Sequence, residues 1–186
     1  MKIRLAASLQ ADSIVDGEGI RTVVWTQGCP HHCPGCHNPD THDFLDGKEF
    51  DVEEIMAELD QLEDQDGLTF SGGDPFVQPG ACYAIAKYAK SKDWNIWCYT
   101  GYLFEDLIKL SRTNRDITNF LNYIDVLVDG KFVLAKRSLS TAYRGSTNQR
   151  IIDVKKSLKA GHVITIDKYD HKEEMRTKPK PVGLYL

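Results

Sequence analysis

Residues 20–39, IRTVVWTQGCPHHCPGCHNP, join a short apolar run to a loop that holds three of the chain's five cysteines. Residues 20–26 are rich in β-branched and aromatic side chains and end close to a glycine, which predicts a β-strand leading into the loop. In the loop, Cys29, Cys33 and Cys36 have the spacing C-x-x-x-C-x-x-C. An odd number of cysteines, with three crowded together, suits a reducing compartment and a metal site better than a disulfide framework.

Beyond this strand, apolar runs alternate with stretches of helical periodicity. Asp51 followed by Glu54 has the form of a capping box, and the apolar residues after it predict a helix that ends near residue 64. Further helices are predicted at residues 80–92, 103–110 and 113–123, and further strands at residues 67–75, 95–102, 124–130 and 162–167. This alternation indicates an α/β domain with a parallel sheet.

Glycine, aspartate and threonine are frequent just after the predicted strands. The carboxyl ends of parallel strands meet at one edge of a sheet, where α/β enzymes place their active sites, so we expect these residues to gather there. They are Gly28, Cys29, Ser71, Gly72, Gly73, Asp74, Thr100, Gly101, Asp129, Gly130, Lys131 and Asp167. Glycine and aspartate also end strands for purely conformational reasons, so each residue alone is weak evidence for a site.

Three kinds of site compete for the cysteine cluster. A structural zinc site needs four protein ligands, and the fourth would come from a loop histidine or from Cys82 or Cys98. A thioredoxin-like redox pair would use Cys33 and Cys36 but leave Cys29 without a role. A 4Fe-4S cluster suits three thiolates from one compact loop and leaves one iron open to a substrate or cofactor. Cys82 and Cys98 stand in apolar segments and are interpreted as small buried residues.

Other polar residues have less specific patterns. The loop histidines are interpreted as solvated residues, or as hydrogen-bond partners of the cluster sulfurs, rather than as ligands. Asp129 and Lys131 are placed to touch a ribose, a carboxylate or a cation, and equally to form an ordinary turn. Thr100 is a weaker candidate, and nothing in the composition of RGSTNQ, which begins at Arg144, assigns it a role.

Composition and charge restrict the class of protein. With 186 residues, of which 41% are hydrophobic, the chain can bury one good core. We expect a single domain over residues 1–186, with residues from about 168 to 186 as a flexible tail. A formal net charge of −4 and scattered basic residues argue against a nucleic-acid partner. The N-terminal apolar stretch is too short for a secretory signal or a membrane span, so we expect a cytoplasmic protein without a membrane partner.

The spacing of the cysteines after a first strand resembles that of the radical S-adenosylmethionine enzymes. Within that superfamily the likeness covers most of the chain, and the segments resemble those of the activating components of anaerobic ribonucleotide reductases. The segments are VDGEGIRTVVWTQGCPHHCPGCHNP, TFSGGDP, IWCYTGY, IDVLVDGKFV and YRGSTNQRIIDV. The resemblance implies a partial, open parallel β/α barrel of the radical S-adenosylmethionine type, and the chain is indeed short beside the roughly 250 residues of a complete eight-stranded barrel.

The resemblance also implies roles for particular residues. The implied ligands of a 4Fe-4S cluster are Cys29, Cys33 and Cys36. The implied contacts to S-adenosylmethionine are Gly35, Cys36, His37, Gly72, Gly73 and Asp74. The two adjacent glycines let the backbone approach the cofactor, and the carboxylate that follows can accept hydrogen bonds from its amino group. In the wider superfamily this glycine motif usually ends in glutamate, so the shorter Asp74 differs in reach, although it also suits this subfamily.

The function implied by the resemblance is activation of anaerobic ribonucleoside-triphosphate reductase. Reductive cleavage of S-adenosylmethionine at the cluster would give a 5′-deoxyadenosyl radical, which leaves a glycyl radical on the reductase, and a low-potential donor such as flavodoxin would supply the electron. This chemistry requires no acid or base, so no catalytic side chain is predicted. Alternatives are an activator of another glycyl radical enzyme such as pyruvate formate-lyase, a small-molecule enzyme such as carboxy-deazaguanine synthase, and a non-enzymatic zinc-binding interaction module.

Overall fold

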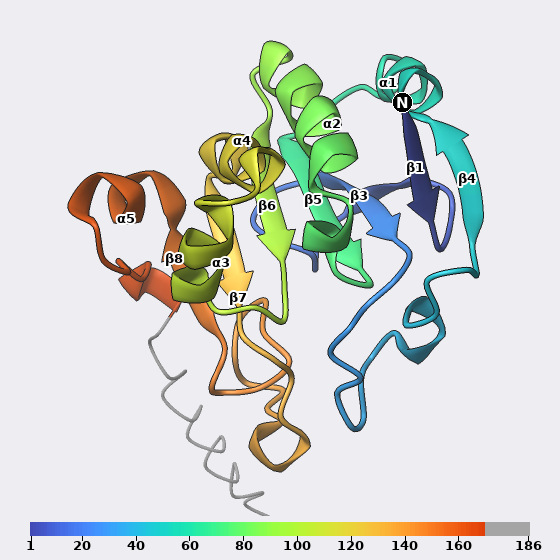
Figure 1. Ribbon diagram of the computed structural model, residues 1–186. Coiled ribbons are helices and arrows are strands. Elements are labelled where there is room, and N and C mark those ends of the chain that lie inside the picture. Colours follow the sequence, from blue (N-terminus) through green and yellow to red (C-terminus); the bar gives the residue numbers. More distant parts are fainter. Residues whose placement is uncertain (170–186) are drawn as a thin grey trace, which may run out of the picture.

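The computed structural model of the chain describes residues 1–169. In these residues an eight-stranded sheet carries helices on one face (Figure 1). The strands are β1 (Lys2–Leu5), β2 (Gln10–Ser13), β3 (Arg21–Thr26), β4 (Lys48–Asp51), β5 (Gly67–Gly72), β6 (Asn95–Tyr99), β7 (Val126–Asp129) and β8 (Arg150–Asp153). The α-helices are α1 (Val52–Leu59), α2 (Pro79–Ser91), α3 (Phe104–Ser111), α4 (Arg115–Tyr123) and α5 (Val154–Ala160).

The centre of the sheet is parallel and its borders are antiparallel. Strands β3, β5, β6 and β7 run parallel in that order, and Val24, Phe70, Cys98 and Leu127 are successive partners across them. Strands β1 and β4 extend the sheet beyond β3, β8 extends it beyond β7, and β2 also pairs with β3. The predicted α/β class with a mostly parallel central sheet is therefore confirmed, whereas the partial barrel stays a prediction.

Apolar side chains hold the helices against the parallel strands. Val24 of β3, Phe70 of β5 and Ile96 of β6 form one buried core with the inner faces of α1, α2, α3 and α4. Phe120 of α4 packs its ring on Phe70 of β5, with the ring centroids 5.2 Å apart. The predicted capping box is present at the start of α1, where the Asp51 and Glu54 side chains cap each other's backbone amides. Helix α1 ends at Leu59, earlier than predicted.

The other face of the sheet carries a smaller core. Trp97, Val128 and Ile151 are buried there together with Tyr169, whose ring centroid lies 5.7 Å from that of Trp97. The Tyr169 hydroxyl also donates a hydrogen bond to Glu18 at 2.6 Å. The first residues of the predicted tail are thus packed against the sheet, and the remainder of that prediction, residues 170–186, lies outside the described residues.

The prediction of a strand at residues 162–167 is wrong. That segment makes only an isolated bridge between Thr165 and Ile152. The edge position belongs to β8, where Ile151 and Ile152 are buried and pair antiparallel with β7. As a consequence Asp167 does not join the predicted site: it lines a cavity at the opposite end of the strands, together with Arg21 and Asn95.

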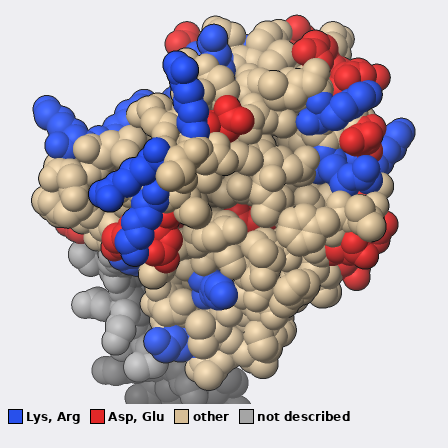
Figure 2. All heavy atoms as spheres, viewed as in Figure 1, with Lys and Arg blue, Asp and Glu red and all other residues tan. Residues whose placement is uncertain are grey.

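Charges of both signs are interspersed over the helical part of the surface (Figure 2). The lower centre of that view, where Figure 1 places the loops after β3 and β7, is mostly uncharged. None of the helices among residues 1–169 is long and apolar enough to cross a membrane.

Candidate active site

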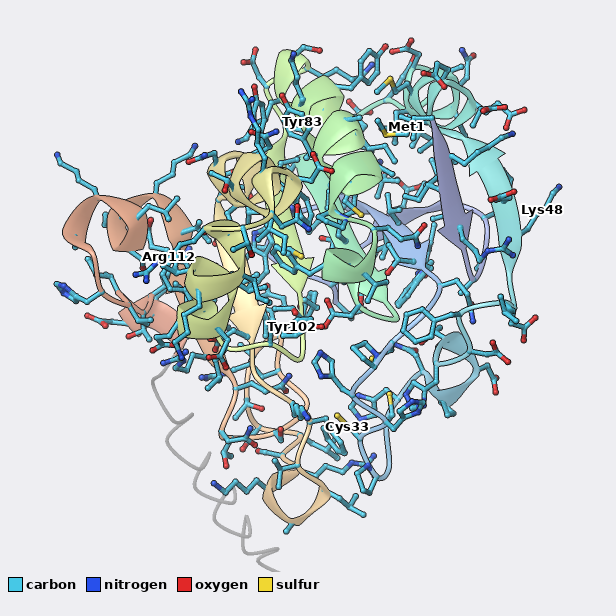
Figure 3. All side chains as sticks on the ribbon, in the orientation of Figure 1. Met1, Cys33, Lys48, Tyr83, Tyr102 and Arg112 are labelled. Atoms are coloured by element: carbon cyan, nitrogen blue, oxygen red, sulfur yellow. The ribbon has the colours of Figure 1, made fainter. Side chains whose placement is uncertain are left out.

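The carboxyl ends of the parallel strands point toward a common edge of the sheet, as predicted. Figure 1 shows two long loops at this edge, one after β3 and one after β7. In Figure 3 the labelled Cys33 belongs to the first loop and lies on its side that faces the second loop. The labelled Tyr102 lies above it, just after β6. A cavity of about 630 Å³ is lined by residues of both loops and of the strand ends, a size in the usual range for small-molecule sites.

Most of the predicted site residues come together in this cavity. Those that line it are Cys29, Cys33, Cys36, His37, Gly72 and Gly73. Two others, Gly35 and Asp74, are not among the lining residues. Gly35 adopts a positive φ of 74° inside the cysteine loop, a conformation that favours glycine. Its place in the sequence is therefore explained by the turn that brings Cys33 and Cys36 together.

Backbone hydrogen bonds close the cysteine loop at its base. The amide of Gly28 donates to the Thr41 carbonyl at 2.9 Å, and the amide of Cys29 donates to the His42 carbonyl at 3.1 Å. The Gln27 side-chain amide donates two further hydrogen bonds to backbone carbonyls in the C-terminal part of the loop. Inside the loop, the amide of Cys36 donates to the Cys33 carbonyl at 3.0 Å. The loop is thus held in a defined shape by the chain itself.

The three loop cysteines are free thiols, as are Cys82 and Cys98. Burial raises the pKa of Cys29, and the nearby Asp74 carboxylate raises it further. Burial likewise raises the pKa of Cys33. Bound iron stabilises the thiolate form of its ligands, and three cysteines of one ordered loop line one cavity, so this donor set fits an iron–sulfur cluster.

The glycines after β5 are required by the approach of two strand ends. A Cβ atom on Gly73 would lie 2.3 Å from the Gly28 carbonyl oxygen, and Gly72 adopts a φ of 96°. This contact is reinforced by two hydrogen bonds, from the Gly73 amide to the Thr26 carbonyl at 2.7 Å and from the Asp74 amide to the Gly28 carbonyl at 2.8 Å. The backbone of Gly72 and Gly73, called the Gly72–Gly73 edge below, therefore lies directly against the start of the cysteine loop.

The Asp74 carboxylate is fully buried and is surrounded by donors from the chain. Its Oδ1 accepts a hydrogen bond from the Phe76 amide at 3.0 Å. Its Oδ2 accepts bonds from the Gly101 amide at 3.0 Å, from the Thr100 hydroxyl at 2.9 Å and from His31 Nε2 at 2.7 Å. The side chains through which this carboxylate meets the cavity are those of His31 and Thr100, since both residues line it.

Comparison with known proteins shows the family of this chain. A family model described as a 4Fe-4S single cluster domain matches residues 15–152. The anaerobic ribonucleoside-triphosphate reductase-activating protein of Haemophilus influenzae is 36% identical over 146 residues, which are 74% of this chain and 90% of that protein. Its counterpart in Pasteurella multocida is 38% identical over 147 residues, again 74% and 90%. In Escherichia coli K12 the values are 35% over 145 residues, 73% of this chain and 90% of the relative.

This chain belongs to the anaerobic ribonucleoside-triphosphate reductase-activating protein family. The crystal structure of QueE from Escherichia coli also aligns, with a TM-score of 0.46 and 14% identity over 54% of this chain and 53% of that one. That likeness is too slight to define the fold.

The residues that the sequence marked as weaker site candidates differ in their contacts in this member of the activating-protein family. Thr100 holds Asp74, as described above. Asp129 is fully buried and binds Arg150 and the Phe104 amide, so its carboxylate is engaged within the fold. Lys131 is exposed and does not line the cavity. Arg144 does line it, and also donates to the carbonyls of Gln149 and Tyr169.

The contact of His31 with the site was not predicted from the sequence. The loop histidines are predicted to be solvated or to be hydrogen-bond partners of the cluster sulfurs, but the His31 side chain is only 7% exposed and bonds to Asp74. His32 fits the prediction, because it is exposed, with its ring against His42. Within residues 1–169, no three side chains of the His, Cys, Asp and Glu types converge in a way that would hold a single metal ion.

Proposed function

We propose that this protein activates an anaerobic ribonucleoside-triphosphate reductase by generating a glycyl radical on it. The observation that carries the proposal is that Cys29, Cys33 and Cys36 line one cavity together with the Gly72–Gly73 edge, in a chain that belongs to this family of activating proteins. Three cysteine ligands leave one iron of a 4Fe-4S cluster open for the cofactor.

The chain's own residues would hold and orient the reacting groups. Cys29, Cys33 and Cys36 would hold the cluster, and the Gly72–Gly73 edge would let S-adenosylmethionine approach the backbone closely. Gly35 and His37 belong to the proposed cofactor site, and Asp74 would contribute to it through His31 and Thr100, the side chains by which its carboxylate meets the cavity. When bound, the cluster would supply one low-potential electron and S-adenosylmethionine the sulfonium, and reductive cleavage would give methionine and a 5′-deoxyadenosyl radical able to take a hydrogen atom from a glycine.

The mouth of the cavity supports a polypeptide as the substrate. Val15 and Leu139 line the cavity and are 70% and 93% exposed. Exposed apolar side chains at a cavity mouth suit contact with a protein segment better than closure around a small molecule. A low-potential donor such as flavodoxin would supply the electron for each turnover.

The proposal is tested by electron paramagnetic resonance on the cognate reductase. The reductase is incubated anaerobically with the reconstituted protein, a reductant and S-adenosylmethionine, and 5′-deoxyadenosine is assayed in the same samples. The proposal predicts a glycyl radical signal on the reductase that requires all components. A signal on a pyruvate formate-lyase alone, or modification of a small molecule, would keep the chemistry but assign a different substrate. A colourless protein that binds zinc and cleaves no cofactor would contradict the proposal outright.

A further inference from the structure

His31 connects the cysteine loop to the ends of β5 and β6. It lies between Cys29 and Cys33 in the sequence, and its Nε2 is 2.7 Å from Asp74 Oδ2. Nε2 is the ring nitrogen that faces this carboxylate, and as an N–H it would donate to Oδ2. The ring also makes an edge contact with Tyr102, with 4.6 Å between the ring centroids and an angle of 75° between the planes.

Gly101 provides the space into which the His31 ring fits. A Cβ atom at position 101 would lie 2.3 Å from His31 Cδ2, far inside contact distance. The backbone of Gly101 is not in the positive-φ region, unlike that of Gly72, so its conformation alone does not call for glycine. The close approach of the imidazole explains why position 101 is a glycine, and it indicates that the fold leaves a defined space for this ring.

The partner of His31 is itself held rigidly. Asp74 accepts hydrogen bonds from the Phe76 amide beyond β5, and from Thr100 and the Gly101 amide beyond β6. His31 adds a donor from the cysteine loop. Through Asp74, the loop is therefore fixed to two strand ends at a point between two of its cysteines.

We propose that His31 is a positioning residue, which sets where Cys29 and Cys33 hold the cluster relative to the Gly72–Gly73 edge. The inference rests on the proposed function for its consequence, since the distance between cluster and cofactor matters only if both bind here. Its structural part, the attachment of the loop through Asp74, does not depend on that function. The competing view is that His31 only fills the place of the cofactor amino group at Asp74 and leaves when the cofactor binds.

The first test uses the apo protein and needs no activity. Amide hydrogen exchange is measured at Cys29 and Cys36, whose amides bond within the loop, in the wild type, His31→Ala and His31→Gln. His31→Ala should exchange about tenfold faster at these amides, because opening of the loop becomes easier, while amides of β5 keep their protection. His31→Gln retains an N–H donor and should recover much of the protection. His32→Ala, an exposed neighbour in the same loop, is the matched control and should behave as the wild type.

The second test uses the reconstituted protein with S-adenosylmethionine. His31→Ala should bind iron like the wild type but bind the cofactor about tenfold more weakly. Addition of the cofactor should also change the electron paramagnetic resonance spectrum of the reduced cluster less than in the wild type. His31→Gln should restore part of both. Gly101→Ala should reproduce the defect of His31→Ala, because its methyl group displaces the ring. The double variant should bind S-adenosylmethionine little more weakly than either single variant.

Each outcome decides the inference. Unchanged exchange and unchanged cofactor binding in His31→Ala would overturn it. Tighter cofactor binding in that variant would also overturn it, in favour of a histidine that merely competes for Asp74. A wild-type protein that cleaves S-adenosylmethionine but forms no radical on the reductase would refute the proposed function, while the exchange data would still decide the role of His31.

Discussion

Arg150 binds both carboxylate oxygens of Asp129, with Nε donating to Oδ1 at 2.9 Å and Nη2 donating to Oδ2. The same guanidinium also makes two hydrogen bonds to Glu105, at 3.0 and 2.7 Å. Asp129 Oδ2 in addition accepts a bond from the Phe104 amide at the start of α3. This arrangement fixes the end of β7, the start of β8 and the start of α3 to one another at the edge of the cavity.

Replacing Asp129 should therefore destabilise the fold. Asp129→Ala leaves the guanidinium and the helix amide without their acceptor, and we expect a loss of about 2 to 4 kcal/mol in the free energy of unfolding, measured by urea denaturation. Asp106→Ala is the control, since Asp106 pairs with Lys109 at the exposed surface and should cost under about 1 kcal/mol. Equal effects of the two changes would contradict a structural role for Asp129.

Gly73→Ala should disturb both the sheet and the cysteine loop. The added methyl would meet the Gly28 carbonyl oxygen at 2.3 Å, and backbone cannot rotate away as a side chain can. We expect a loss of about 1 to 3 kcal/mol in the free energy of unfolding and a lower iron content after reconstitution. Gly80→Ala in α2 is the matched change: its nearest neighbour is the tip of Asp116, and it should be neutral or stabilise by up to about 1 kcal/mol. A fully stable, fully loaded Gly73→Ala protein would show that this strand contact is dispensable.

The ion pairs of Asp125 should make stability depend on acidic pH. Burial raises the pKa of Asp125, but hydrogen bonds from Lys155, Lys90 and the Ile96 amide outweigh it, and the net pKa is lowered. Because the pKa is lower in the folded state, the stabilisation is complete above the unfolded pKa of about 3.9 and is lost as the pH falls through the folded value. Asp125→Asn should thus be less stable than the wild type at pH 7, and the difference should shrink below about pH 4. A difference that stays constant down to pH 2 would contradict this assignment.

Iron content separates the loop cysteines from the buried ones. Cys33→Ala should lose a stable 4Fe-4S cluster after anaerobic reconstitution, as should the same change at Cys29 or Cys36, since each removes a thiolate ligand. Cys82→Ala should keep it, because Cys82 is fully buried in α2 and burial raises the pKa of its thiol. Iron and sulfide analysis together with the visible absorption spectrum give the result. Full cluster content in Cys33→Ala would remove the basis of the proposed cluster site.

Local patterns in the sequence predicted the parallel centre of the fold well. The strand at Arg21–Thr26, the capping box at Asp51 and the helices α1 to α4 follow from periodicity and end signals, whereas helix α5 was not predicted. Strands β1, β2, β4 and β8 were not predicted. Of these, β1 and β4 are each four residues long and carry charged side chains. Strands β1 and β4 pair with each other, Lys2 with Asp51 and Ile3 with Phe50, and β1 also pairs with β3. Such pairing between distant segments has no local signal.

The candidate site was predictable in its composition but not in its internal contacts. The cysteine spacing and the glycines after a strand can be seen in the sequence, and the structure brings them to one cavity. The partners of Asp74 cannot be seen there, because they come from the cysteine loop, from the turn after β5 and from the end of β6. The burial of His31 depends on a glycine that lies 70 positions later, at Gly101.

Transfer of a hydrogen isotope tests the central claim most directly. The cognate reductase is prepared with glycine deuterated at Cα and incubated anaerobically with this protein, a reductant and unlabelled S-adenosylmethionine, and the 5′-deoxyadenosine formed is analysed by mass spectrometry. The account predicts that 5′-deoxyadenosine gains one deuterium atom, in step with a glycyl radical on the reductase. Formation of 5′-deoxyadenosine without deuterium, while the glycyl radical appears, would contradict direct abstraction from the reductase glycine.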